Sequence, residues 1–392
     1  MDFNDTTEQA QFRKTCREWL EQNAEPKSSS SRESFSDIDF LEVAKQWQKK
    51  KYDAGWAMLH WPKEYGGIAA SPIERIIWAE EESKFNVPRG IFEIGLGMCG
   101  PVMMEYATDE QKERFLPSMA EGTEIWCQLF SEPSAGSDVA GLRSKATQDG
   151  DNWIINGQKV WTSGAHFCDY GILVVRHDPN LEKHKGMTFF FVDMKSPGIE
   201  VKPIKQITGG SSFNEVYFTD VVIPDSQRLG AIGDGWKVAI TTLMNERLAV
   251  GDANGADVKE AFNWAKKQDD SGEYLINNRA TRESIADWYC VANGLKNTKL
   301  RTMSALSKGE TPFPFSSILS VYHTSELLSL SALSSSFFFF FLLFSFFSSL
   351  LPSSFFFFFL SFSLFFSPFF FLFFFLFSLP LFFSSLFFPP FF

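Results

Sequence analysis

The sequence predicts an α+β protein whose segments run in the order helical, all-β and helical, followed by a low-complexity tail. Apolar residues recur at helical spacing from residue 2 to about residue 120. Between residues 125 and 224 short runs of β-branched and aromatic residues replace that spacing, and helical spacing returns at residue 236. We therefore expect domains at residues 1–123, 124–233 and 234–333, with the tail at residues 334–392.

The tail contains only Phe, Ser, Leu and Pro. Codons for these amino acids carry pyrimidines at their first two positions, so the composition indicates translation of a polypyrimidine tract. One alternative is a membrane anchor, although Ser and Pro interrupt the apolar runs and no Lys or Arg flanks them. Another is a disordered segment, which this Phe content would make prone to aggregation. The first interpretation makes the tail foreign to the fold, and we expect no membrane attachment.

The rest of the chain carries all the charge, and its 36 Lys and Arg against 47 Asp and Glu give a net charge of −11. An acidic chain without a basic footprint argues against nucleic-acid binding. The first residues form neither a secretory signal nor a transit peptide. Five cysteines, an odd number without a C-x-x-C motif, indicate free thiols in a reducing compartment, with neither a disulfide framework nor a metal site. We therefore expect a cytoplasmic protein.

Three helices are predicted in the first segment. Apolar residues between positions 38 and 52 lie near helical spacing. Ser71 and Glu74, with a proline directly after the serine, form the pattern of a capping box and predict a helix from residue 72 to 85. Thr108 and Gln111 repeat the capping-box spacing and predict a third helix start.

The second segment is predicted to be an all-β module of about 100 residues. Its strands are expected at the apolar runs 153–155, 172–175, 188–192 and 216–218. Turns are expected at Asn156-Gly157, Asp178-Pro179 and Pro197-Gly198, because these dipeptides favour chain reversal.

Two stretches of this module have residues suited to a ligand. The small residues 134–137 allow a backbone to approach phosphate oxygens closely and point N–H groups at them. The alternative for this stretch is an ordinary turn after a strand. Trp161, followed by two hydroxyl residues, can form a wall for a flat heteroaromatic ring, but tryptophan also commonly fills the core of a β domain.

The helix from residue 236 to 250 has an apolar face with Arg247 at its centre and Glu246 at its margin. A guanidinium in an apolar stripe is costly unless it is paired or used. One interpretation is a structural ion pair with another helix, and the other is a functional site that faces the β module. The apolar face consists of Trp236, Ile240, Leu243 and Val250.

Four motifs stand out in the sequence: FSEPSAGSDVAGL (130–142), INGQKVWTS (155–163), GDGW (233–236) and, nearer the N-terminus, WPKEYGG (61–67). They resemble motifs of the flavin-dependent acyl-CoA dehydrogenases, and the resemblance covers about residues 5 to 333. It implies an N-terminal helical domain, a central β-barrel and a C-terminal four-helix bundle, with FAD between barrel and bundle. It also implies an acyl-CoA substrate, an electron-transfer flavoprotein or similar acceptor, and a homo-oligomer.

Carried over position by position, the resemblance assigns three groups of residues to ligands. Gln128, Phe130 and Ser131 would line the isoalloxazine, and Gly136 and Ser137 belong to the phosphate-binding stretch, with Ser137 also close to the CoA end of the substrate. Lys185 would approach the CoA moiety. The far side of the flavin would be flanked by Trp161, Thr162 and Ser163.

The chemistry of the family needs a carboxylate that removes the α-proton of the thioester. Much of the family places this base late in the bundle, where this chain has no acidic residue after Glu326. A minority places it on the first bundle helix, directly before an arginine, and Glu246-Arg247 matches that arrangement. Glu246 is thus the candidate base and Arg247 a candidate catalytic and substrate-binding residue. The alternative is that Glu246 is an ordinary helix residue and the true base was lost with the C-terminus.

The chain departs from the family pattern in two ways. The Arg-x-Phe-Gly flavin element expected after Asn263 is not evident, and the tail replaces the last helices of the bundle, which makes the bundle incomplete. The leading hypothesis is an FAD-dependent acyl-CoA dehydrogenase. The alternatives are a related flavin oxidase or monooxygenase that passes electrons to oxygen, and a truncated fragment that neither holds FAD nor turns over.

Overall fold

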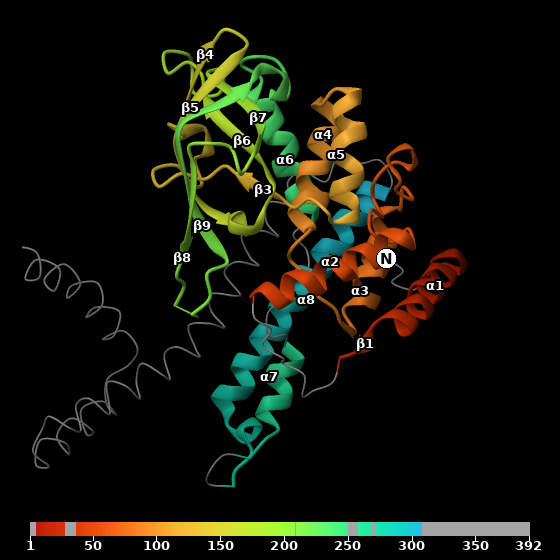
Figure 1. Ribbon diagram of the computed structural model, residues 1–392. Helices are drawn as coiled ribbons and strands as arrows, with labels where there is room; N and C mark the ends of the chain where they lie inside the picture. The colour runs from red at the N-terminus through yellow and green to blue at the C-terminus, as the bar shows by residue number, and fades with distance from the viewer. Residues whose placement is uncertain (1–4, 28–36, 208, 250–257, 269–271, 308–392) are drawn as a thin grey trace, which may run out of the picture. The chain divides into compact units, whose positions relative to one another are not determined.

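The computed structural model describes residues 5–27, 37–207, 209–249, 258–268 and 272–307 (Figure 1). These residues belong to one compact unit. The predicted tail and the end of the third segment, together with the predicted face residue Val250, lie outside the described residues.

The N-terminal part is helical, as predicted. The predicted helices are present as α2, α3 and α5, and both capping boxes form. A small antiparallel sheet of Glu25–Pro26 (β1) and Phe85–Asn86 (β2) joins the chain after α1 to the chain after α3. The helices are α1 (Thr7–Asn23), α2 (Asp37–Asp53), α3 (Pro72–Glu82), α4 (Gly100–Tyr106) and α5 (Asp109–Glu121), with a π-helical turn, η2 (Gly95–Cys99), before α4.

Helices α1 and α3 are joined by one buried carboxylate. The Glu81 side chain is fully buried and accepts hydrogen bonds from Arg13 and Arg17 of α1 and from Lys84, at 2.8 to 3.1 Å. Burial alone would raise the pKa of Glu81, but the hydrogen bonds from the three cations outweigh it and lower the pKa to about 2. A buried anion with three donors therefore fixes the angle between the two helices.

Replacing Glu81 by Gln is expected to destabilise this domain by about 3 kcal/mol at pH 7, because three cations lose their buried partner. Since folding lowers this pKa, the carboxylate stabilises the protein above its unfolded value, and that contribution is lost as the pH falls from about 4.5 toward 2. Denaturation followed by tryptophan fluorescence measures both effects. The control is Glu80→Gln, because Glu80 also binds Arg13 but is 40% exposed. Equal losses in the two variants would contradict the prediction.

The central part is a curled seven-stranded sheet. Its hydrogen-bonded order is β3-β6-β4-β5-β9-β8, with β7 paired to β6, and β3 and β6 run parallel. In the described pairings the two end strands of this order are not hydrogen-bonded to each other, so the central β-barrel that the resemblance implied is present as a curled sheet. The strands are β3 (Trp126–Leu129), β4 (Lys145–Asp149), β5 (Asn152–Ser163), β6 (Tyr170–Arg176), β7 (Met187–Asp193), β8 (Ile199–Ile204) and β9 (Phe213–Pro224).

One predicted turn is wrong. Asn156-Gly157 does not reverse the chain but lies inside β5, at a shift of register against β9. Gly157 has φ +153°, and a Cβ there would lie 2.7 Å from the Cα of Ser144. The glycine therefore serves a β-bulge that bends the strand against its neighbour. The turns at Asp178-Pro179 and Pro197-Gly198 are confirmed, since they connect β6 to β7 and β7 to β8.

The third part begins with α6 (Gly235–Ala249) and continues with α7 (Val258–Ala265) and α8 (Arg279–Ser307). Helix α6 packs against η2, β7 and α4, so it lies between the sheet and the N-terminal helices (Figure 1). The Tyr106 hydroxyl of α4 lies 3.0 Å from the Thr241 hydroxyl of α6 and adds a polar contact to this packing.

The predicted apolar face of α6 coincides only in part with its packed face, since Trp236 and Leu243 are half-buried against the core. The fully buried residues are Val238, Ala239 and Thr242, whereas Ile240 is 39% exposed. At about 100° per residue, Glu246 lies within about 40° of Thr242, so it continues the packed face and does not sit at a margin. Small side chains lie on this face because the π-helical turn η2 packs directly against the helix.

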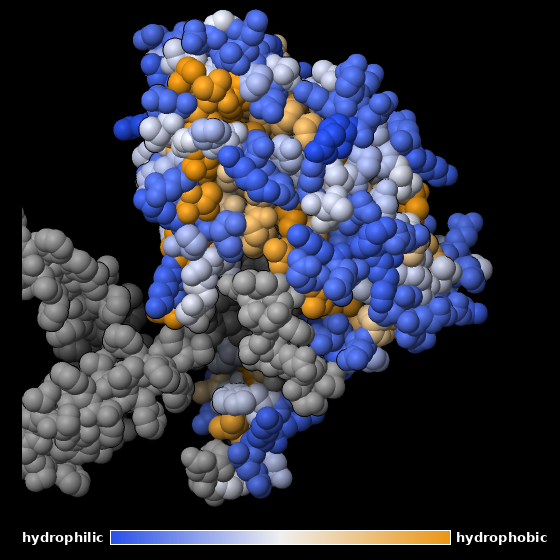
Figure 2. All heavy atoms as spheres, in the orientation of Figure 1, coloured by the Kyte–Doolittle hydropathy of each residue, from blue (hydrophilic) through white to orange (hydrophobic). Residues whose placement is uncertain are grey.

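The described surface is mostly hydrophilic in the view of Figure 2, with hydrophobic residues in patches over the sheet and the neighbouring helices. Among the described residues, no helix has both the length and the apolar character needed to cross a bilayer.

Candidate active site

The predicted flavin motifs meet at one edge of the sheet. Residues 130–144, here called the cradle loop, lead from β3 to β4, and their start lies beside the end of β5. The Val160 amide donates to the Ser131 carbonyl at 2.8 Å, which places Ser131 next to Trp161. Two motifs about 30 residues apart in the sequence thus share one edge.

Trp161 has an unusual backbone and an exposed ring. Its φ is +60°, in the left-handed region that bulky residues rarely adopt, and its side chain is 59% exposed. The indole touches the protein edge-on at Phe213, with ring centroids 6.1 Å apart. The left-handed backbone coincides with a register shift between Lys159 and Thr162. A strained residue that presents a large exposed aromatic ring is typical of a ligand-binding position.

Two hydroxyl residues follow Trp161 at the end of β5. Thr162 is buried, its carbonyl accepts from Asn214 at 3.0 Å, and its hydroxyl has no hydrogen-bond partner among the described residues. Ser163 is half-buried and ends β5 opposite Phe213. A buried hydroxyl without a partner is unfavourable unless something else satisfies it.

Gln128 and Glu246 connect the sheet to α6. Gln128 lies on β3, and its amide nitrogen is 3.4 Å from a carboxylate oxygen of Glu246, which makes a long hydrogen bond. Both side chains are half-buried. The structure therefore brings the candidate base to the strand that leads into the cradle loop.

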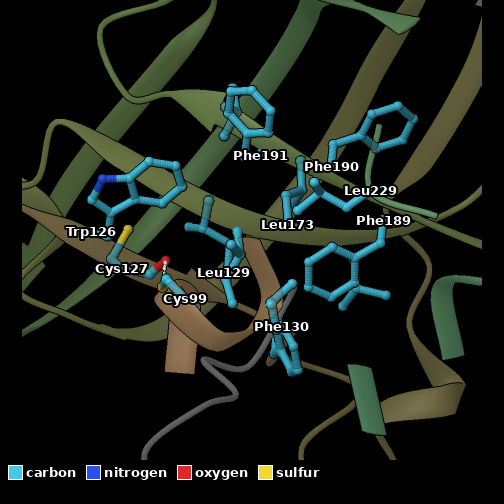
Figure 3. Packing of buried hydrophobic residues seen from close by; sticks show 14 of the residues in the cluster. Cys99, Trp126, Cys127, Leu129, Phe130, Leu173, Phe189, Phe190, Phe191 and Leu229 are labelled. Carbon is cyan, nitrogen blue, oxygen red and sulfur yellow. Dashed lines mark hydrogen bonds between the residues drawn. The ribbon is translucent and has the colours of Figure 1, made fainter. Parts of the chain in front are cut away.

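The Phe130 ring points into the hydrophobic core. It is 4% exposed and lies edge-on to Phe189, with centroids 5.7 Å apart (Figure 3). Any polar contact of this residue with a ligand must therefore come from its backbone. In the same cluster Cys99 donates to the Cys127 carbonyl, which joins η2 to β3.

The small-residue stretch is open to solvent. Gly136 and Ser137 are exposed, and a Cβ added at Gly136 would meet no atom within 4 Å. Lys185 is exposed and pairs with Glu182 at 2.9 Å. Arg247 belongs to α6, but its side chain lies outside the described residues. The assignments of Ser137, Lys185 and Arg247 to substrate stay predictions.

A separate hollow of about 350 Å³ lies between the N-terminal helices and α6. Its wall includes His60, whose pKa burial lowers to about 4, so that the ring is neutral at neutral pH. No residue of the predicted flavin set lines this hollow. One of its lining residues, Asn245, directly precedes Glu246 on α6. Its lining comprises His60, Trp61, Pro62, Glu64, Tyr65, Pro101, Met104, Glu105 and Asn245.

Sequence reasoning missed the buried ion pair under the cradle loop. Lys159 is fully buried, and its ammonium donates to Glu132 at 2.8 Å and to the Phe130 carbonyl at 3.0 Å. Burial lowers the pKa of Lys159 to about 8, and the Glu132 carboxylate opposes that shift. Strand alternation could have indicated that Lys159 is buried, because counting by two from the buried Trp153 reaches it, but it could not have identified Glu132 as the partner.

The sequence also matches known protein families. Residues 127–221 match the model of the acyl-CoA dehydrogenase middle domain, residues 6–123 that of the N-terminal domain and residues 233–328 that of the C-terminal domain. A relative at 34% identity, acyl-CoA dehydrogenase IpdE1 of Mycobacterium tuberculosis, matches over 279 residues, 69% of this chain and 72% of its own length. The chain belongs to the acyl-CoA dehydrogenase family.

Acyl-CoA dehydrogenase FadE34 of M. tuberculosis is 47% identical over 210 residues, which cover 53% of this chain but only 29% of FadE34. Among solved structures, the ChsE4–ChsE5 complex of M. tuberculosis aligns with a TM-score of 0.67 at 30% identity and 83% coverage of both chains. Butyryl-CoA dehydrogenase of Megasphaera elsdenii, at 21% identity and a TM-score of 0.64 over 86% of this chain and 89% of its own, shows the shared fold.

Replacing Trp161 by Gly is expected to leave the stability of the protein unchanged or to raise it by up to about 1 kcal/mol, because the strained backbone is relieved. FAD affinity, measured by fluorescence titration, is expected to fall by about tenfold or more, because the exposed ring is lost. Ala69→Gly is the matched control, since Ala69 also has positive φ (+52°) but lies outside the cradle. A stability loss in Trp161→Gly with unchanged FAD affinity would contradict a binding role.

Proposed function

We propose that this protein is an acyl-CoA dehydrogenase that holds FAD between the cradle loop, the end of β5 and α6. The observation that supports it most strongly is the strained, exposed Trp161 beside Ser131, because Ser131 follows closely after Gln128, which contacts Glu246. The residues present suit a flavin, because the cradle offers an exposed aromatic wall, a buried hydroxyl without a partner and an open glycine position.

Bound FAD would supply the hydride acceptor for the β-carbon of the thioester. Ser131 and the residues Trp161 to Ser163 would line the ring, and Gly136 and Ser137 would lie along its phosphates or the CoA end of the substrate. The Phe130 ring would keep water from the sheet side because it fills the core there.

In this proposal Glu246 removes the α-proton. The half-buried carboxylate lies on the packed face of α6, and the Gln128 amide limits its movement by donating to it. Arg247, the next residue, is proposed to bind substrate. The departing electron pair of the C–H bond forms the α,β double bond as hydride leaves the β-carbon, and the proton remains on Glu246.

An electron-transfer flavoprotein or similar acceptor is proposed to reoxidise the enzyme, and association with further family chains is proposed as well. Two of the similar structures are named for two proteins, the Tcur3481–Tcur3483 steroid ACAD and the ChsE4–ChsE5 complex. The first aligns with a TM-score of 0.68 at 26% identity. These likenesses support association without identifying the partner.

The first test is purification of the full chain and measurement of its visible absorption. Bound flavin with stoichiometry near one per chain supports the proposal. A soluble, colourless protein that does not bind added FAD would contradict it and favour a non-catalytic fragment. If flavin is bound, reoxidation in air compared with reoxidation by an artificial acceptor distinguishes a dehydrogenase from an oxidase.

Replacing Glu246 by Gln is expected to leave FAD bound while acyl-CoA-dependent bleaching of the flavin slows by about a thousandfold or more, because the proton acceptor is lost. Stopped-flow absorption measures the reduction rate. Glu105→Gln is the control, because Glu105 is an exposed carboxylate on nearby α4 and should leave the rate unchanged. Reduction at an undiminished rate in Glu246→Gln would move the base to another residue.

A further inference from the structure

The cradle loop is closed at its neck by one buried carboxylate. Glu132 near the start of the loop accepts hydrogen bonds from the backbone amides of Arg143 at 2.6 Å and Ser144 at 3.0 Å at its end. The Glu132 carbonyl and amide also pair with the amide and carbonyl of Ala135. The carboxylate therefore joins the two ends of a loop that is exposed at Gly136 and Ser137.

Lys159 supplies the positive charge that this buried carboxylate needs. Its ammonium donates to Glu132 and also to the Phe130 carbonyl, so it contacts the residues on both sides of Ser131. Lys159 is 0% exposed and Glu132 is 6% exposed, so neither charge is compensated by water. Two residues later in the same strand, Trp161 adopts its left-handed backbone.

We propose that Glu132 and Lys159 are positioning residues that fix Ser131 and Trp161 in the arrangement that receives the flavin ring. Lys159 donates to the Phe130 carbonyl and to the Glu132 carboxylate, and the amide of Val160, the next residue, donates to the Ser131 carbonyl. The strain at Trp161 persists because the preceding residues cannot shift while Lys159 is bound to the loop. This inference rests on the proposed function only for the identity of the ligand.

The test compares single variants, which leave one buried charge unpaired, with a double variant that has neither charge, so that an effect on the loop can be distinguished from a loss of stability. Lys159→Met leaves a buried carboxylate unpaired and Glu132→Gln leaves a buried ammonium unpaired, so both single variants should lose stability. The double variant Glu132→Gln/Lys159→Met removes both buried charges, so its melting temperature should lie well above those of the single variants, although its amide group keeps only one acceptor oxygen for the Arg143 and Ser144 amides. It nevertheless lacks the ammonium that held Phe130 and Glu132.

Two measurements on the full chain read out the position of the loop. Hydrogen exchange followed by mass spectrometry reports on peptides that contain residues 130–144 and 158–163 without any ligand. In the double variant their exchange should be faster by about tenfold or more, while the N-terminal helices exchange as in the wild type. The Kd for FAD should rise by about tenfold or more, because the ring site is no longer pre-organised.

Glu81→Gln is the control for general destabilisation, because Glu81 is also a buried carboxylate paired with cations but belongs to α3. It should lower the melting temperature and leave both readouts of the loop unchanged. A double variant that regains stability with wild-type exchange and wild-type FAD affinity would overturn the inference. A wild-type chain that binds no FAD would contradict the proposed function, whereas the exchange measurement would still decide whether the pair fixes the loop.

Discussion

The candidate site depends on a charge pair that water does not reach. A lysine ammonium and a glutamate carboxylate in the interior each cost several kcal/mol of desolvation, which is tolerated only when partners satisfy all sides. At Lys159 and Glu132 those partners are backbone groups of the cradle loop. These contacts restrict the conformation of the loop, because any other conformation would leave a buried charge or a backbone amide unpaired.

The second constraint is the contact of α6 with η2. Leu96 lies in the π-helical turn, and its carbonyl accepts a hydrogen bond from the indole nitrogen of Trp61 at 2.9 Å. The same carbonyl lies 3.2 Å from a ring nitrogen of His60. Close packing on this turn favours Val238, Ala239 and Thr242, and thereby turns Glu246 toward Gln128. A helical wheel drawn from hydrophobicity alone cannot detect this preference, because small residues are less hydrophobic than Trp236 or Ile240 although they allow closer packing.

The features that the sequence predicted correctly depend on interactions between residues close together in the chain. The caps at Ser71 and Thr108 involve residues three positions apart, so their patterns are visible in the chain, and the strands follow from composition. The bulge at Gly157 and the Lys159–Glu132 pair could not be read in this way. Each depends on a partner brought close by the sheet, 13 positions away for Ser144 and 27 for Glu132. The motifs identified the residues at the site, but their geometry required the fold.

The cradle loop is also supported from its far end. Arg176 on β6 donates to the Ala140 carbonyl at 2.6 Å and to the Leu142 carbonyl at 3.0 Å, and both of its terminal nitrogens donate to the Lys183 carbonyl. Lys159 is neutralised by Glu132, whereas the hydrogen bonds of Arg176 that the structure describes all go to neutral carbonyl groups. Arg176 therefore holds the loop at Ala140 and Leu142, after the small residues at 134–137, while Lys159 holds it at Phe130 and Glu132, before them.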